Sequence, residues 1–415
     1  MARTALDSVR IADLTNVIAG PVSTRMLAQL GAEVIKVELP WGRAIGNITM
    51  HASGSGDRPY NQVTSFNEVN RAKKSIAIDL THEEGRETFK EIVGISDIVI
   101  QNFSPRVMSN LGLDYDSLVS IKPDIIMVSM PALGLEGPWS QYISFGPGTD
   151  ALSGLSSITG YRDGPPHKPG NFYADHNSAF HVAAGIMSSL YRRFVTGEGQ
   201  HIEIVLREAT MSVIGEHFLE YQLTGKEPTR MGNDHTNFSP HGIYPCEGDD
   251  SWIAISVEST EEWLNLCNVV GSDRLRDAEE LRELSERKNQ RDSIDSEIQL
   301  WTLERTRYQA MKELQSGGVR AGAVTKASDI LSDPNIETRG YLDRFDHPDA
   351  GPSTTPGLPF QFSGMPVIQG IRAPLYSEHT EWILKDLLGI SGDKARAMAE
   401  AGTTPLEPID RVYHS

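Results

Sequence analysis

Short apolar runs alternate with amphipathic stretches over the first 130 residues. Helices are predicted near 22–30, which ends before Gly31, and at about 82–93, where Thr81-His-Glu-Glu84 has the form of a capping box. This alternation predicts a parallel sheet with crossover helices. Strands are predicted at VRIADL (9–14), VIKVE (34–38), IAIDL (76–80), DIVIQNF (97–103) and DIIMVSM (124–130).

Ligands of such a sheet bind beyond the carboxyl ends of its strands. Neither the GxGxxG motif nor the P-loop motif is present, so an ordinary dinucleotide or P-loop site is not predicted. A different phosphate-bearing ligand can use helix N-termini and the basic cluster Arg71, Lys73 and Lys74, although a solvated surface is the favoured interpretation of that cluster. The relevant loops are 15–21, 38–45, 101–106 and 129–138.

A segment rich in Gly, Pro, Ser and Thr at 139–175 leads into a long apolar helix that begins near Asp175. Apolar residues recur at helical spacing as far as Leu190, and Gly197 lies just beyond the predicted end. Asp is a preferred helix cap, so capping is one interpretation of Asp175. The other is a nucleophile that the helix dipole keeps ionised. The pattern alone leaves both open.

After about residue 224 the pattern changes to a smaller α+β region. Strands are predicted at GIYPC and WIAISV, followed by a helix near 260–271 that begins with the Ser259-Thr-Glu-Glu262 box, and by charged helices at about 274–316. A final helix is predicted near 377–388. We therefore predict an α/β large domain at 1–224, a small α+β domain at 225–330, and a return segment at 331–415 that completes the large domain.

Composition narrows the class of protein. The 415 residues carry a formal net charge of −18 and are 39% hydrophobic, which suits two domains and argues against nucleic acid or an anionic membrane surface as a partner. No run of about eighteen apolar residues and no signal-peptide pattern occurs, so we expect a cytoplasmic protein. Only Cys246 and Cys267 are present, and no spacing is typical of a metal site.

Several motifs in a fixed order resemble the class III CoA-transferases, the CaiB/BaiF family that includes formyl-CoA transferase and carnitine CoA-transferase. The resemblance covers nearly the whole chain and implies a Rossmann-like large domain with an inserted small domain, in an interlocked homodimer. The motifs are IADLTNVIAGPVSTRMLAQLGAEVIKVE, NRAKKSIAIDL, DIVIQNFSPRVMSNLGLDYDSL, GPPHKPGNFYADH, RRFVTGEGQHIEIVLREA, GIYPC, GVRAGAV, DPNIETRG and APLYSEHTEWILKDLLG.

The resemblance also implies the chemistry. In this family an aspartate attacks an acyl-CoA thioester to give an aspartyl-acyl anhydride and CoA thiolate, and exchange with an acceptor carboxylate completes the transfer. Asp175 matches that aspartate. Coenzyme A is then a substrate, and no tightly bound cofactor is expected. Backbone donors for an oxyanion are expected from the loop 131–138 or from Gly242.

The CoA-binding residues are carried over position by position, with basic candidates added for the phosphates. Ile18, Leu39 and Asn110 depart from formyl-CoA transferase, which has glutamine, arginine and arginine at these places, so other basic residues must compensate for the lost charges. The predicted set is Val17, Ile18, Leu39, Arg43, Lys73, Lys74, Ile78, Thr81, Asn102, Phe103, Arg106, Asn110, Pro131, Leu133 and Gly134.

Two alternatives remain open. A 2-methylacyl-CoA racemase on the same fold needs a histidine paired with the aspartate, but Phe145 stands at the histidine's place, and His176 is too close in sequence to oppose Asp175 across one carbon. The other alternative is a non-catalytic subunit of a heteromeric CoA-transferase.

The substrate is predicted only by similarity. The stretch FGPGTDALSGLSSITGYRDGPP is similar to relatives that act on succinyl-CoA or other dicarboxylic acyl groups. Arg230, His235 and His241 are candidates for binding a distal carboxylate, with an ordinary loop surface as the equal alternative.

Overall fold

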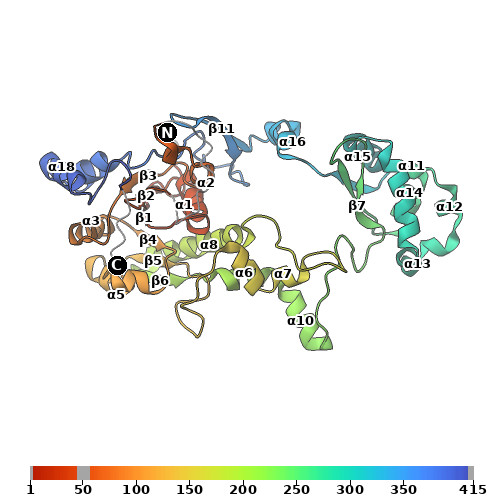
Figure 1. Cartoon of the computed structure of the whole chain (residues 1–415), viewed down its shortest axis with the longest axis horizontal. Helices are drawn as coiled ribbons and strands as arrows, with labels where there is room; N and C mark the ends of the chain where they lie inside the picture. Colours follow the sequence, from red (N-terminus) through yellow and green to blue (C-terminus); the bar gives the residue numbers. More distant parts are fainter. Residues whose placement is uncertain (1–2, 44–56, 410–415) are drawn as a thin grey trace. The chain divides into compact units, whose positions relative to one another are not determined.

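The computed structural model describes residues 3–43 and 57–409. The chain divides into two compact units (Figure 1). One unit is formed by residues 1–155, 168–225 and 335–415, and the other by residues 156–167 and 226–334. Within the described residues, no helix has both the length and the apolar character that crossing a membrane requires.

The first unit is built on a six-stranded parallel sheet with the strand order β3-β2-β1-β4-β5-β6. The predicted α/β class is confirmed, and the five predicted runs overlap β1 to β5, although β3 ends at Ala77 rather than at residue 80. Strand β6 was not predicted, because QHIE has no apolar run. The strands are β1 Arg10–Asp13, β2 Glu33–Glu38, β3 Lys74–Ala77, β4 Ile98–Gln101, β5 Ile126–Ser129 and β6 Gln200–Glu203.

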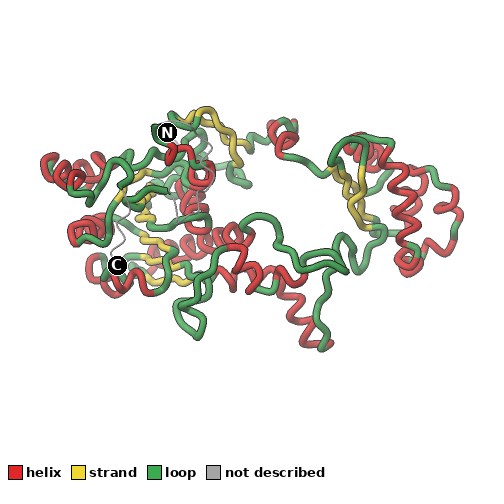
Figure 2. The backbone as a smooth tube through the Cα atoms, viewed as in Figure 1, coloured by secondary structure: helices red, strands yellow, loops and turns green. Residues whose placement is uncertain are grey.

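Helices cover both faces of this sheet, as Figures 1 and 2 show. On one face α1 (Ala19–Gln29) and α8 (Tyr173–Thr196) pack against strand residues such as Ile11 and Val34. On the other face α3 (Glu83–Gly94), α5 (Tyr115–Ile121) and the π-helical turn η4 (Trp382–Leu387) pack against Ala12 and Ile35. Successive strand residues therefore supply opposite faces, as expected for a strand buried on both sides.

The predicted capping box at the start of α3 is wrong. His82 is the N-cap, and no side chain caps this helix. Thr81 instead donates its N–H and its hydroxyl to Asp79 Oδ1, at 2.9 and 2.7 Å. Because Thr81 is bonded within the turn formed by residues 79–81, it does not cap the helix.

The remaining short helices lie mostly in the first unit. They are η1 Pro59–Gln62, α2 Thr64–Val69, α4 Arg106–Asn110, α6 Gly146–Leu152, α7 Leu155–Ile158, α9 Leu206–Met211, η2 Ser212–Ile214, α10 Gly215–Thr224, α17 Pro334–Thr338 and α18 Gly392–Glu400.

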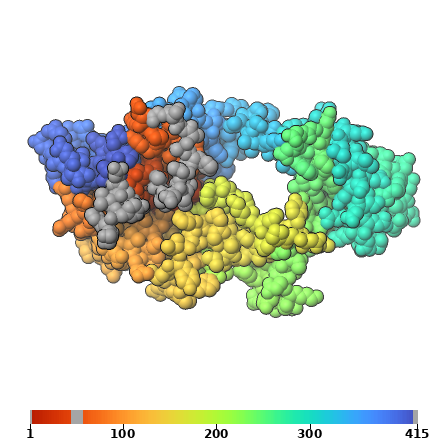
Figure 3. Space-filling model, in the orientation of Figure 1, coloured from red at the N-terminus to blue at the C-terminus, as the bar shows by residue number. Residues whose placement is uncertain are grey.

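The C-terminal part of the chain returns to the N-terminal part, and Figure 3 shows its blue residues against red and orange ones. The antiparallel strands β10 (Leu342–His347) and β11 (Gly351–Pro356) carry Asp343 to Arg71, with which it forms a fully buried ion pair. Further along, Ser377 N–H donates to Ser75 Oγ at 3.1 Å. Losing one partner of the buried pair would cost about 3–5 kcal/mol, because the other charge would remain buried.

The second unit has a three-stranded antiparallel sheet covered by helices, whose core includes Trp263, Leu266 and both cysteines. The predicted box at Ser259 forms only in part: Ser259 Oγ accepts from Glu262 N–H at 3.1 Å, but the Glu262 carboxylate accepts from Glu258 N–H. The elements are β7 His241–Pro245, β8 Trp252–Ser256, β9 Arg320–Ala323, α11 Thr260–Val270, α12 Asp273–Asp277, η3 Glu279–Arg282, α13 Leu284–Asn289, α14 Arg291–Leu303, α15 Arg307–Ser316 and α16 Ala327–Leu331.

Candidate functional site

Asp175 lies in the first turn of α8, but it is not the N-cap. The N-cap is Phe172, which has a positive φ of 54° and makes no side-chain capping bond. A bulky residue with positive φ is strained, and such strain gathers at functional sites. Because Phe172 occupies the cap position and no side-chain capping bond is made, the interpretation of Asp175 as the helix cap is wrong.

The Asp175 carboxylate is buried, with the residue 6% exposed. It faces Gly146, the first residue of α6: a Cβ built on Gly146 would lie 1.9 Å from Asp175 Oδ2. Oδ2 has no hydrogen-bond partner among the described residues. A buried carboxylate oxygen without a partner is costly, and the position beside it is kept clear by a glycine.

Burial raises the pKa of Asp175 from its ordinary 3.8 to about 6. The neighbouring His176 and the N–H of Ala19 at the start of α1 lower this pKa, whereas the carboxylate of Asp150 raises it. Desolvation of the charged form is the largest of these influences, and it outweighs those that favour ionisation. Asp175 is still mostly ionised at pH 7, and it is more basic than an exposed aspartate.

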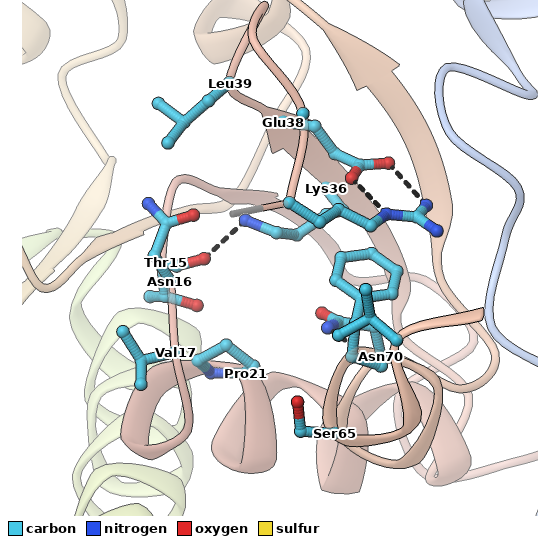
Figure 4. A pocket seen from close by; sticks show the side chains of 13 residues that line it. Thr15, Asn16, Val17, Pro21, Lys36, Glu38, Leu39, Ser65 and Asn70 are labelled. Carbon is cyan, nitrogen blue, oxygen red and sulfur yellow. Dashed lines mark hydrogen bonds and ion pairs between the residues drawn. The ribbon is translucent and has the colours of Figure 1, made fainter. Parts of the chain in front are cut away.

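A pocket opens beyond the carboxyl ends of β1 and β2, where a parallel sheet is expected to bind ligands (Figure 4). In Figure 4 the Lys36 ammonium reaches across to the carbonyl of Thr15, and the Ser65 hydroxyl points into the pocket from α2. Ser65 Oγ has no partner among the described residues. The lining residues are Thr15, Asn16, Val17, Pro21, Lys36, Glu38, Leu39, Gly42, Arg43, Val63, Ser65, Phe66 and Asn70.

Three predicted CoA-binding residues, Val17, Leu39 and Arg43, line this pocket. Val17 has a φ of 67°, a strained value for a β-branched residue. Asn102 supports the lining residue Asn16, since its Oδ1 accepts from Asn16 N–H and its Nδ2 donates to Asn16 O, both at 2.8 Å. This pair fixes the loop after β1 to the loop after β4.

The pocket and Asp175 share one loop. Val17 lines the pocket, and the predicted residue Ile18 is the buried N-cap of α1. The next residue, Ala19, presents its backbone N–H to the Asp175 carboxylate. The three consecutive residues Val17, Ile18 and Ala19 therefore connect the pocket to Asp175.

Several of the predicted basic residues already have partners inside the protein. Arg43 donates to both oxygens of Glu38, at 2.7 and 2.9 Å. The ammonium of Lys73 donates to Asp13 at 3.0 Å, to Pro21 O at 3.0 Å and to Asn70 Oδ1 at 2.8 Å, which uses all three donors. Arg71 and Lys73 are buried, so the surface interpretation of that cluster is wrong for both.

The other predicted contacts are spread over the first unit. Ile78 lies in the core and Thr81 is exposed next to Asp79. Lys74 Nζ lies 5.9 Å from the ring centroid of Trp382.

Phe103 is partly buried and follows Asn102, and its N–H donates to Gln101 Oε1 at 2.7 Å. In α4, Asn110 is exposed, and so is Arg106, which donates to Gln141 Oε1 at 2.6 Å. The loop with Pro131, Leu133 and Gly134 is anchored to α9, since Leu206 N–H donates to Pro131 O at 3.1 Å.

Sequence reasoning missed Gly146, Asp150, Lys36 and Ser65. A lysine inside the apolar run VIKVE was the available signal for Lys36, because a buried strand lysine needs a special partner. Nothing in the sequence pattern distinguishes Ser65. The FGPG segment was predicted to be a loop and used only as a similarity to relatives that act on dicarboxylic acyl groups, so it did not single out Gly146 or Asp150.

The three candidates for a distal carboxylate lie in the second unit. Arg230 donates to Gly164 O and Ser157 O, both at 3.1 Å. His235 and His241 line a separate pocket with Arg162, Lys288 and Arg291. Gly242 belongs to β7 of the same unit. Among the described residues, no group of three or more His, Cys, Asp or Glu side chains is arranged to hold a metal ion.

The chain is similar to known proteins over nearly its whole length. The model of CoA-transferase family III matches residues 6–380. A formyl-CoA:oxalate CoA-transferase of Rhodopseudomonas palustris (strain BisA53) is 29% identical over 96% of this chain and 97% of its own. A succinyl-CoA:mesaconate CoA-transferase of Haloarcula hispanica is 33% identical over 92% of this chain and 96% of its own.

Solved structures agree with this assignment. The crystal structure of a CaiB/BaiF family protein from Brucella suis has a TM-score of 0.83 and 30% identity, over 93% of this chain and 100% of that one. A Mycobacterium tuberculosis protein shares the fold, with a TM-score of 0.76 at 23% identity. The chain belongs to CoA-transferase family III and is an enzyme of this class.

Proposed function

We propose that the enzyme transfers CoA from an acyl-CoA donor to a carboxylic acid through an anhydride on Asp175. The observation that carries this proposal is the buried Asp175 carboxylate, whose Oδ2 has no partner among the described residues and whose neighbour is a glycine. Oδ2 bonds to the thioester carbonyl carbon, the C–S bond breaks, and CoA leaves as a thiolate. No proton is transferred, so the step requires only that Asp175 is ionised. The acceptor carboxylate then attacks the Asp175 carbonyl carbon and displaces the donor acid, which leaves an anhydride of the acceptor. The CoA thiolate attacks the acceptor's acyl carbon, which forms the new acyl-CoA and frees the Asp175 carboxylate.

The CoA portion of the donor is proposed to bind at the pocket beyond β1 and β2. The short path from Val17 to Ala19 supports this, because it brings one end of the pocket to Asp175. Asn16 and Asn102 hold that path in place from both sides of the loop. Of the proposed phosphate contacts, Lys74 and Arg106 are supported best. Arg43 and Lys73 are bonded to carboxylates, whereas the exposed Arg106 donates to the neutral amide of Gln141.

The acyl group of the CoA donor is proposed to be dicarboxylic. Both relatives described above are named for dicarboxylic acids, oxalate and mesaconate, and the second also for succinyl-CoA. A second carboxylate needs a cation or several N–H donors. His235 and His241 were the predicted candidates, but two cations of their pocket, Arg162 and Arg291, are already paired with Asp234.

A homodimer is proposed as the working form. The family resemblance implies an interlocked pair, and large apolar side chains remain exposed on α8 and α10, with Phe194 87% and Leu223 85% exposed. Exposed apolar surface of this kind marks an interaction site. Sedimentation of the purified enzyme should give twice the chain mass of 45.7 kDa, and a monomer at micromolar concentration would contradict the proposal.

Trapping the intermediate tests the mechanism. We expect hydroxylamine, added to enzyme with succinyl-CoA, to leave a hydroxamate on Asp175 that mass spectrometry locates. Acetyl-CoA should label it less. The matched control is Asp175→Asn, which keeps the shape but has no carboxylate and should remain unlabelled. A hydroxamate on another residue, or none with any donor in enzyme that still binds CoA, would overturn the proposal.

The effect of Asp175→Asn on the free energy of unfolding, relative to wild type, should depend on pH. The folded-state pKa of Asp175 is raised from 3.8 to about 6, so the folded state binds more protons in this window and loses stability as pH rises through it. Removing the carboxyl should therefore stabilise the protein by about 2–3 kcal/mol at pH 8 and by almost nothing at pH 4. Urea unfolding at both pH values measures the difference, with the exposed Glu136→Gln as control. A variant less stable than wild type at pH 8 would refute this cost.

Gly146→Ala should separate activity from folding. Its Cβ would lie 1.9 Å from Asp175 Oδ2, so the carboxylate must move. A misplacement of about 1 Å costs roughly 100-fold in rate, and we expect a loss of this size in kcat. Gly215→Ala is the matched control, because a Cβ there meets nothing within 4 Å. Equal kcat values for the two variants, measured in steady state, would show that the contact is unimportant.

A further inference from the structure

A second buried carboxylate, Asp150 of α6, lies beside the candidate nucleophile. The residue is completely buried. Its Oδ1 accepts a hydrogen bond from Ala174 N–H at 3.1 Å, and its Oδ2 has no partner among the described residues. A buried carboxylate in this condition is unfavourable, so its presence needs an explanation.

The hydrogen bond to Ala174 holds the start of α8. The first amides of a helix have no partner within the helix, and a capping side chain usually supplies one. Phe172 cannot do so here, and it enters the helix from a strained conformation. Asp150 therefore supplies, from another helix, the acceptor that the local sequence lacks. Ala174 is the residue directly before Asp175, so this bond fixes the peptide that carries the nucleophile.

Helix α6 makes this contact together with a second one. Gly146, one helical turn before Asp150, lies against the Asp175 carboxylate. The two residues share one face of α6, which is expected for positions four apart. One side of a short helix thus both clears space beside Asp175 and anchors the peptide before it.

The charges around Asp175 come from few groups. On α8 the neighbour is His176, and on α6 it is Asp150, which itself is influenced by Lys168. Helix α1 contributes the N–H of Ala19 rather than a charged side chain. Arg207 of α9, the remaining helix packed here, is directed to Leu152 O. Burial raises the pKa of both carboxyls.

We propose that Asp150 is a positioning residue for Asp175, which anchors the peptide before the nucleophile and sets a second buried carboxyl group beside it. An ionised Asp175 is repelled by this neighbour. Acylation removes the charge of Asp175 and with it the repulsion, so Asp150 favours attack by the free carboxylate. This inference rests on the proposed function of Asp175.

Two variants separate the roles. Asp150→Asn keeps an oxygen acceptor for Ala174 N–H and removes the charge, whereas Asp150→Ala removes both. We expect the pH at which Asp175 labelling is half-maximal to fall below the wild-type value in Asp150→Asn, with kcat lowered and KM for acyl-CoA unchanged. Asp150→Ala should lose more kcat than Asp150→Asn. Glu400→Gln, which removes an exposed carboxylate at the end of α18 in the same way, should leave all three quantities unchanged.

A second readout does not depend on catalysis. The stability gained by Asp175→Asn at pH 8 should be smaller in the Asp150→Asn background than in wild type, because the repulsion is already gone. This double-mutant cycle decides the matter if Asp150→Ala does not fold. No coupling in the cycle, or a wild-type pH midpoint in Asp150→Asn, overturns the inference. If Asp175 is never labelled in wild type but the coupling is present, the proposed function fails and the pairing of the two carboxyls stands.

Discussion

The structure around the site depends on one buried carboxylate, Asp13 at the end of β1. Its Oδ1 accepts from Thr15 N–H at 2.8 Å and from the Thr15 hydroxyl, and its Oδ2 accepts from Thr24 of α1 at 2.7 Å and from Lys73 at 3.0 Å. These bonds join the end of the central strand, the loop after it, the first helix and the chain entering β3. Asp13 therefore fixes the loop after β1, and with it the pocket wall and Ala19.

Asp13 and Asp175 show how partners decide the character of a buried aspartate. Burial opposes ionisation of both. For Asp13, the charges of Lys73 and Lys36 and the two threonine hydroxyls outweigh burial and lower its pKa to about 2. For Asp175, burial prevails, since the neighbouring Asp150 carboxyl adds to it. The first residue is therefore a permanent anion that organises structure, and the second is a basic carboxylate with an unshared oxygen, which suits a nucleophile.

Strands β1 to β5 were predictable because each overlaps an apolar run, whereas β6 was not, because it lacks one. The family motifs singled out Asp175 as the candidate nucleophile. What could not be predicted depends on contacts between distant segments. Thr81 has the right spacing to cap α3, but its hydroxyl donates to Asp79 instead. Lys73 looks like a surface cation, and only the folded chain shows that Asp13, Pro21 and Asn70 surround it. Asp150 resembles any loop aspartate until α6 is packed against α8. The periodicity of apolar residues indicates which face of one helix or strand is buried. It does not indicate which side chain of another element will bond to that face.

The packing of the C-terminal segment against the N-terminal part affects how the chain folds during synthesis. The Tyr376 hydroxyl donates to Leu39 O and Pro40 O, both at 2.9 Å, and these residues follow β2 at the rim of the pocket. Contacts so distant in sequence form late in folding. On the ribosome, the N-terminal strands therefore emerge long before the segment that completes their sheet surface. A truncated product ending before this segment would expose the apolar face that Ile383 and Leu384 cover, and would be a target for chaperones and proteases rather than a slower enzyme.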